Sequence, residues 1–226
     1  MPLMFLLTCS NENDARVTLN FGDGTLPNAS YDTYYNSVNQ YVSAFDTYYD
    51  PGSNPVPLDV VTITVAVYND TELLFQRDYP RLIKTAVLDF PAANGITVAV
   101  GAKNNLEKIV DFGKYGSFSI NPGEEKTISI LMESVLPPQN INGTLFASVG
   151  YFPLDWDPVY ATDGYVIERS IVSDTGPFSV IGTSDTNSFA DYSAQDETYY
   201  YWRIKAVFDF IGETDYSSVY QIFVYL

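Results

Sequence analysis

Apolar and polar residues alternate with a period of two along much of this chain, as expected for β-strands with one buried face. The clearest runs are residues 61–67 and 200–207, and shorter runs occupy residues 16–21, 86–90, 96–100, 117–120, 127–130 and 165–169. Val, Ile, Thr, Tyr and Phe dominate these runs, Gly and Pro separate them, and no long helical period is present. The sequence therefore predicts an all-β protein.

Two turn signals separate strands that are expected in the first half of the chain. Asn94-Gly95 lies between two such strands, and this dipeptide is typical of tight β-hairpins. Residues 121–124 (Asn-Pro-Gly-Glu) separate two others by a common kind of tight connection. That second pair is similar to the final strands of many immunoglobulin-like bacterial surface domains. We therefore expect residues 15–133 to form an immunoglobulin-like β-sandwich.

The last third of the chain carries a more specific order of motifs. In the strand at residues 200–207, Arg203 and Lys205 fall on one face and the aromatic and aliphatic side chains on the other. A Trp precedes the strand at residues 165–169, which alternates in the same way. Four large side chains are therefore expected in the core: Trp156, Tyr165, Tyr200 and Trp202.

This order of motifs, from Trp156 to Ser218, resembles the fibronectin type III domain. The resemblance covers about residues 137–226 and implies a seven-strand β-sandwich that serves as a spacer or binding module outside the cytoplasm. It also implies that Tyr200 forms the family's tyrosine corner, with a buried ring and a hydroxyl that bonds to nearby backbone. The whole chain is thus expected to contain two consecutive β-sandwich domains, the second fibronectin type III-like, with a boundary near residues 134–138.

One departure from the family pattern is the turn at residues 208–211 (Phe-Asp-Phe-Ile), where a polar turn is usual. An apolar turn either forms a contact site or packs on the neighbouring domain. We favour packing.

Composition and charge exclude several classes of partner. The 226 residues include 28 acidic and 11 basic ones, which gives a net charge of −17. Nucleic acid is not expected as a partner, because phosphate contacts need clustered Lys and Arg. The acidic residues are scattered through loops without a calcium-binding run, so we expect neither a metal nor another cofactor.

The residue types needed for common catalytic sites are missing. The chain contains no histidine, which excludes Ser-His-Asp and Cys-His chemistry and histidine-bound zinc. Asp155 and Asp157 could form the carboxylate pair of a glycosidase, but such residues usually end a strand in this kind of domain. We therefore predict that the protein is not an enzyme.

The single cysteine lies at the end of an apolar segment near the N-terminus. Residues 1–8 are mostly apolar, Cys9 follows, and the polar residues 10–14 come directly after it. This order resembles the end of a bacterial lipoprotein signal peptide, which implies that Cys9 carries lipid and that residues 10–14 form a short tether. A free thiol in a terminal tail is the alternative.

A tyrosine-rich segment between residues 28 and 57 has no clear strand period. Its rings lie beside Asn, Gln and Asp residues, a composition that suits a protein contact or a sugar face, although the rings could also cover the edge of a sandwich. The candidate binding residues are Tyr31, Tyr34, Tyr35, Tyr41, Tyr48 and Tyr49.

Together these features predict a non-catalytic lipoprotein of the bacterial cell envelope, at the outer membrane or cell surface, that acts as an interaction or spacer module. Its expected partners are the membrane, through the N-terminal lipid, and an unknown protein or polysaccharide. The alternative function is an accessory carbohydrate-binding lipoprotein of a polysaccharide-uptake system.

Overall fold

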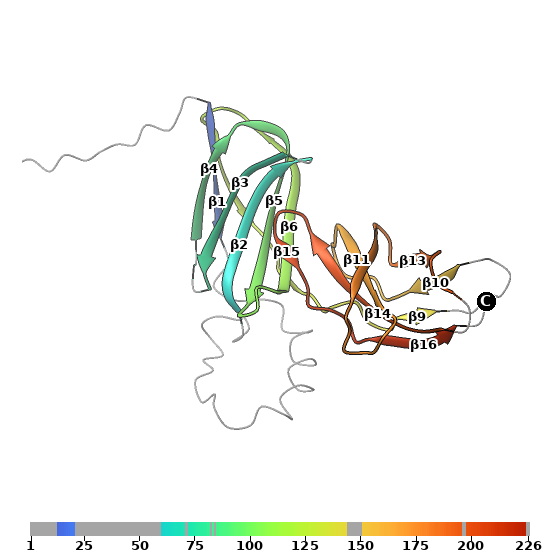
Figure 1. Cartoon of the computed structure of the whole chain (residues 1–226). Helices are drawn as coiled ribbons and strands as arrows, with labels where there is room; N and C mark the ends of the chain where they lie inside the picture. The colour runs from blue at the N-terminus through green and yellow to red at the C-terminus, as the bar shows by residue number, and fades with distance from the viewer. Residues whose placement is uncertain are drawn as a thin grey trace, which may run out of the picture. The chain divides into compact units, whose positions relative to one another are not determined.

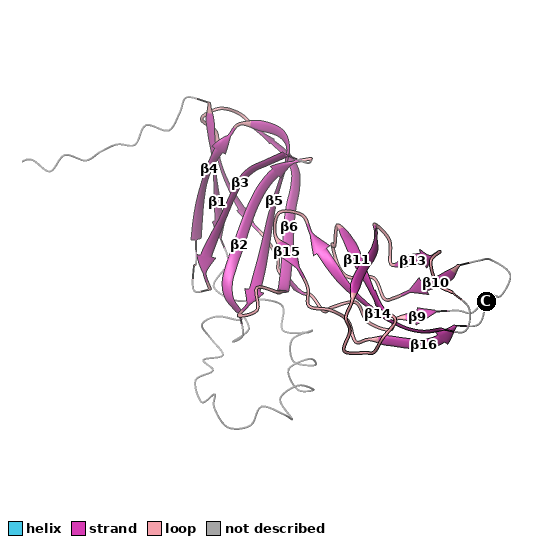
Figure 2. Ribbon diagram, in the orientation of Figure 1, coloured by secondary structure: helices cyan, strands magenta, loops and turns pink. Residues whose placement is uncertain are grey.

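The structure is a computed structural model that describes residues 13–20, 60–70, 72–81, 83, 85–143, 151–195 and 198–224. These residues form strands and connecting segments only, so the all-β prediction is confirmed (Figures 1 and 2). The chain divides into two compact units. Unit 1 consists of Met1–Val100 and Gly113–Met132, and unit 2 consists of Gly101–Phe112 and Glu133–Leu226.

The smaller sheet of unit 1 has the strand order β4-β1-β7. Strand β1 (Asp14–Asn20) pairs antiparallel with β4 (Thr85–Pro91) and parallel with β7 (Glu125–Ser129). Every second side chain of β1 is buried, namely Ala15, Val17 and Leu19. Strand β4 alternates in the same way, as a strand with one face on a core requires.

The larger sheet has the order β3-β2-β5-β6-β8. Its strands are β2 (Val60–Asn69), β3 (Glu72–Pro80), β5 (Ala93–Asn104), β6 (Ile109–Ile120) and the two-residue β8 (Glu133–Ser134). A tight connection joins β5 to β6, and the resulting hairpin has its tip, Gly101–Phe112, in unit 2. The sequence pattern gave no indication of β3, because its charged residues interrupt the alternation and most of its side chains are exposed.

The prediction of a hairpin turn at Asn94-Gly95 is wrong. Both residues lie inside β5, and β4 pairs with β1 instead of β5. Only Ala92 separates β4 from β5, so the chain changes sheets there. Gly95 has a φ of 68°, a left-handed conformation that glycine adopts without strain.

The turn at residues 121–124 is present, but it also joins strands of different sheets. The N–H of Glu124 donates to the carbonyl of Asn121 at 3.0 Å, and Gly123 has a φ of 73°. A positive φ at the third turn position, after Pro122, defines a type II turn. It leads from β6 in the larger sheet to β7 in the smaller one.

Unit 2 contains two further sheets. The first has the order β13-β10-β9, with β9 (Asn142–Gly143), β10 (Phe152–Asp155) and β13 (Ser188–Asp191). The second has the order β12-β11-β14, with β11 (Gly164–Ser170), β12 (Ser179–Ser184) and β14 (Thr198–Phe208). Strands β15 (Gly212–Glu213) and β16 (Tyr220–Val224) both pair with β14, so they are two parts of one edge strand.

Large aromatic side chains fill the space between these two sheets. Phe152 of β10 stacks on Trp202 of β14 with 4.9 Å between ring centroids, and Trp156 meets Tyr165 edge to face at 5.1 Å. Burial of each such side chain stabilises the fold by about 2–3 kcal/mol. The two-sandwich architecture predicted from the strand pattern is thus the observed one.

Candidate interaction surface

Part of the predicted site lies outside the described residues. This applies to Cys9 and to the whole tyrosine-rich set, Tyr31, Tyr34, Tyr35, Tyr41, Tyr48 and Tyr49. Lipidation at Cys9 and binding by these tyrosines therefore stay predictions.

The four aromatic residues expected in the C-terminal core are all buried. Trp156, Tyr165, Tyr200 and Trp202 are between 0% and 3% exposed. The Tyr200 hydroxyl accepts a hydrogen bond from the backbone N–H of Gln195 at 2.8 Å, which is the geometry of a tyrosine corner. The Tyr165 hydroxyl accepts a bond from the N–H of Val159 at 2.9 Å.

A buried carboxylate holds this core together. Asp191, at the end of β13, accepts hydrogen bonds from the indole N–H of Trp202 at 3.1 Å and from Arg169 at 2.7 Å. Its other oxygen accepts bonds from the N–H and the hydroxyl of Ser193. The Arg169 guanidinium also lies over the Tyr200 ring, 4.8 Å from its centroid. The charge of Asp191 is thus fully paired, as a carboxylate that is 2% exposed requires.

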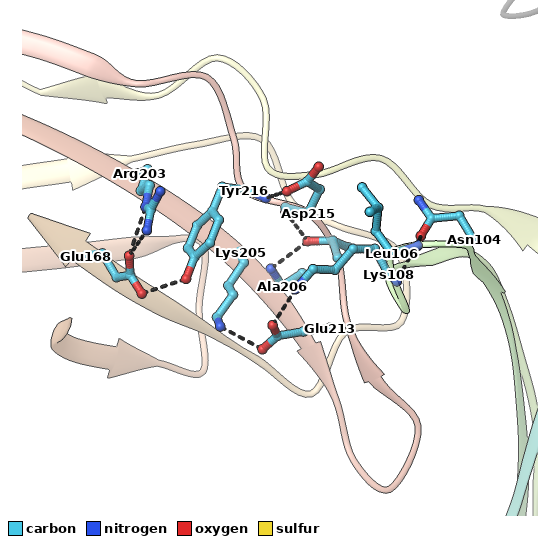
Figure 3. Close-up of polar contacts among 11 residues, drawn as sticks. Asn104, Leu106, Lys108, Glu168, Arg203, Lys205, Ala206, Glu213, Asp215 and Tyr216 are labelled. Atoms are coloured by element: carbon cyan, nitrogen blue, oxygen red, sulfur yellow. Dashed lines mark hydrogen bonds and ion pairs between the residues drawn. The ribbon is translucent and has the colours of Figure 1, made fainter. Parts of the chain in front are cut away.

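The edge strand beside β14 is interrupted between β15 and β16, and two hydroxyl groups bridge the interruption. The hydroxyl of Thr214 accepts from the N–H of Ala206 at 3.0 Å, and that of Ser217 accepts from the N–H of Ile204 at 2.9 Å. The intervening residues leave the strand path, and this places Tyr216 over the outer face of the sheet (Figure 3).

Tyr216 covers one side of an arginine on that outer face. Arg203 of β14 lies between two rings, with its guanidinium carbon 3.8 Å from the Tyr216 centroid and 4.1 Å from the Phe178 centroid. It donates two hydrogen bonds, of 2.8 and 2.6 Å, to Glu168 of β11. The Tyr216 hydroxyl donates to the other oxygen of Glu168 at 2.6 Å (Figure 3).

A second group of charges continues this network along the same unit. Glu213 forms ion pairs with Lys205 of β14 and with Lys108 of the β5–β6 tip, both at 2.7 Å (Figure 3). The turn beside it is also packed on this tip. Phe208 and Ile211 are 1% and 2% exposed, and the Phe208 ring lies 4.4 Å from that of Phe112.

These contacts change the pKa values of the acidic groups. Burial by itself would raise the pKa of Glu168, but the hydrogen bonds from Tyr216 and Arg203 hold it below its ordinary value. The pKa of Glu213 is also lowered, because the hydrogen bonds from Lys108 and Lys205 outweigh the effect of burial. Burial and the bond to Glu168 raise the pKa of the Tyr216 hydroxyl. Both carboxylates are thus stabilised as anions, which suits ion pairs more than proton transfer.

The start of β14 adds aromatic surface to the outer face. Tyr199 is 52% exposed and meets Phe223 of β16 edge to face, with 4.7 Å between centroids and 64° between planes. Tyr201 lies two residues further along the same face and is half-buried. We call this face, with Glu168, Phe178, Tyr199, Tyr201, Arg203, Lys205, Tyr216 and Phe223, the outer face of unit 2.

Sequence reasoning placed Arg203 and Lys205 correctly on the outer side but did not find their partners. Glu168 alternates outward on β11, and register places it opposite Arg203. The alternation alone indicated that both charges face outward, whereas their pairing depends on strand neighbours that a single sequence does not reveal. Phe178 and Tyr216 lie in connecting segments, where no period predicts a direction.

The chain is similar to several solved structures of fibronectin type III domains. Among solved structures, the chain is similar to an Fn3-like protein from Clostridium thermocellum, with 23% identity and a TM-score of 0.36 over 41% of this chain and 96% of that one. It is also similar to the sixth fibronectin type III domain of a human protein, with 17% identity and a TM-score of 0.34 over 39% of this chain and 83% of that one. For the chicken CNTN1 FN1–FN3 domains the identity is 14% and the TM-score is 0.35, over 74% of this chain and 55% of that one.

No protein-family model matches the chain, and no curated protein matches it. Two features define the fold class of unit 2. One is its strand order, with β13-β10-β9 in one sheet and β12-β11-β14 with the divided edge strand in the other. The other is the hydrogen bond of the Tyr200 hydroxyl. Unit 2 is a β-sandwich of the fibronectin type III kind, as the order of motifs predicted.

Within the described ranges, no group of three or more His, Cys, Asp or Glu residues could hold a metal ion. In the same part of the chain, no helix has the length and apolar character needed to cross a membrane.

Proposed function

We propose that this protein is a non-catalytic interaction or spacer module of the bacterial cell envelope, held at the membrane by a lipid on Cys9. The observation that carries the proposal is the outer face of unit 2. Its charged groups pair with one another, as Arg203 does with Glu168 and Lys205 with Glu213. Tyr199 is exposed on this face beside Phe223, and such aromatic surface suits contact more than chemistry.

The ring geometry favours a protein partner over a polysaccharide. A sugar stacks on flat, coplanar aromatic surface, whereas the Tyr199 and Phe223 planes meet at 64°. Aromatic and arginine side chains on a rigid sheet are common at the centres of protein interfaces. The tyrosine-rich segment is a second candidate surface, supported by its composition.

The lipid anchor is supported by the order of the N-terminal residues, in which an apolar run ends at Cys9 and polar residues follow. The test is membrane fractionation in a bacterial host, with the protein expressed behind a complete lipoprotein signal. The wild-type protein should sediment with membranes and resist salt washing, because acyl chains contribute about 0.8 kcal/mol per buried methylene. Cys9→Ser should be released or remain unprocessed, and equal partitioning of the two proteins would disprove the anchor.

The interaction role is tested by binding to envelope proteins and polysaccharides from the same host. Replacement of Tyr34, Tyr35, Tyr48 and Tyr49 by Ser tests the tyrosine-rich segment, and Tyr199→Ser with Tyr201→Ser tests the outer face. Loss of binding in one set, with unit 2 still folded, identifies the surface. If both sets bind as the wild type does, neither surface is the contact site.

A further inference from the structure

Strand β12 is an edge strand with unusual features. In the order β12-β11-β14 it is the outermost strand, and it pairs antiparallel with β11 from Arg169↔Ser179 to Tyr165↔Ser184. Among the strands that the structure describes, none pairs with the side of its backbone that faces away from β11, so this side can serve as a template for another strand. The register shifts between Ile167 and Glu168, so Ile181, in the middle of β12, has no partner on β11, and residues 182–184 pair with β11 beyond it.

Two of the devices that protect a strand edge, charged side chains and proline, are missing from β12. Edge strands are commonly protected by charged side chains or by proline, which disfavour pairing with another chain. Strand β3, at the edge of the larger sheet of unit 1, has both, with Arg77, Asp78 and a terminal Pro80. Strand β12 has the sequence Ser-Val-Ile-Gly-Thr-Ser, which contains no charge and no proline.

Exposed aliphatic side chains lie on β12 and in the connection that precedes it. Val180 of β12 is 60% exposed, and Ile171 and Val172, in the connection that leads into β12, are 63% and 65% exposed. Val180 lies opposite Glu168 in the register, and therefore on the outer face of the sheet. A strand added beside β12 would find apolar side chains on that face to cover its own.

Charge indicates the kind of strand that fits. Exposed carboxylates flank β12 on both sides, with Asp174 before it and Asp185 after it. A second copy of this chain is disfavoured as the occupant, because two proteins of net charge −17 repel each other. A cationic segment is attracted by the same charges.

We propose that β12 binds an extended, cationic segment of a partner protein, which adds to the sheet as a new edge strand. Backbone hydrogen bonds to β12 hold the segment, Val180, Ile171 and Val172 cover its apolar side chains, and Asp174 and Asp185 pair with its basic ends. The inference rests on the proposed role of the protein as an interaction module and identifies the chemistry of its partner.

The test uses a fluorescent peptide of six alternating Thr and Val residues with two Lys at each end, matched to the six residues of β12. We expect saturable binding to the full chain by fluorescence anisotropy, with weaker binding as salt rises. Val180→Lys should weaken binding about tenfold or more, since a lysine on an edge disfavours pairing and repels the peptide. The matched control is Val61→Lys, at a valine that is 45% exposed on β2, which has neighbours on both sides; it should bind as the wild type does.

A peptide with proline in place of the central Val separates strand addition from charge attraction, because proline cannot donate the ladder hydrogen bond. Equal affinity for the two peptides would overturn the proposal, and so would equal binding by Val180→Lys. A dimer in light scattering that Val180→Lys dissociates would also overturn it, because the occupant would then be a second copy. Fractionation of the Cys9→Ser variant tests membrane attachment separately, so a failure of strand addition is distinguishable from a failure of the envelope role.

Discussion

At the scale of single residues, unit 2 contains buried polar side chains that are held by specific hydrogen bonds. Tyr200, Asp191 and Glu168 are all less than 9% exposed, and each takes part in hydrogen bonds that cross between strands or loops. A buried polar group costs free energy when its partner is removed, usually about 1–3 kcal/mol. Substitutions at these positions should therefore have larger effects than those at exposed tyrosines or acids nearby.

The Tyr200 hydroxyl provides a direct test. Tyr200→Phe leaves the N–H of Gln195 without its acceptor, so we expect a loss of about 1 kcal/mol in the free energy of unfolding. Tyr201→Phe, on the outer face, should change stability by less than about 0.5 kcal/mol. Urea denaturation of both variants measures the difference, and equal losses would contradict the assigned strand faces.

The lowered pKa values of Glu168 and Glu213 predict a dependence of stability on pH. A carboxyl whose pKa is lower in the folded state stabilises the fold above its ordinary value, near 4.5, and this contribution is lost as pH falls through that value and then through the folded-state pKa. Between about pH 5 and pH 3 the wild type should therefore lose stability. Glu168→Gln should be less stable at pH 7 but lose less over this interval; equal slopes would show that Glu168 contributes nothing to it.

At the scale of elements, the strands that contain regular alternation could be predicted from sequence, and their partners could not. Strand β14 was located within a few residues and its buried face was assigned, because tyrosine, tryptophan and isoleucine recur at every second position. The pairing of β4 with β1 was missed, since the Asn94-Gly95 signal is local and the register depends on contacts far apart in sequence. The strand pattern did not predict the bridging hydroxyls, because the side-chain oxygens of Thr214 and Ser217 accept hydrogen bonds there in place of backbone carbonyls.

The bridging hydroxyls can be tested with a neighbouring pair of serines. Ser217→Ala removes the acceptor for the N–H of Ile204, so we expect a loss of about 1–2 kcal/mol and faster hydrogen exchange at Ile204. Ser218→Ala is the matched control, because Ser218 is exposed and should tolerate the change. Unchanged exchange at Ile204 in the first variant would show that another group supplies the acceptor.

At the scale of the whole molecule, unit 2 is assembled from two separate stretches of the chain. The tip of the β5–β6 hairpin contributes Phe112, Lys108 and Gly101 to contacts with Phe208, Glu213 and Ile211. The resemblance to a known domain, which covers residues 137–226, contained no sign of this addition. The apolar turn at residues 208–211 was the only hint, because its side chains need a surface to cover them.

Close packing at this tip predicts the effect of one added methyl group. A Cβ at Gly101 would overlap the Ile211 side chain, so Gly101→Ala should destabilise unit 2 by about 1–3 kcal/mol. Leu106→Ala, in the same hairpin but 65% exposed, is the control and should have little effect. Thermal unfolding followed by tryptophan fluorescence reports on unit 2, since Trp156 and Trp202 both lie there. A wild-type melting temperature for Gly101→Ala would mean that the hairpin tip adjusts without cost.

The divided origin of unit 2 has a consequence for synthesis of the protein. Phe112 leaves the ribosome about 100 residues before Phe208 and Ile211, and translation proceeds at roughly 5–20 residues per second. For about 5–20 seconds the nascent chain therefore presents the apolar side chains of the hairpin tip, Ile109 and Phe112, without their cover. During that interval the tip is a natural site for chaperone binding, and a ribosome that stalls before residue 208 would leave an aggregation-prone product.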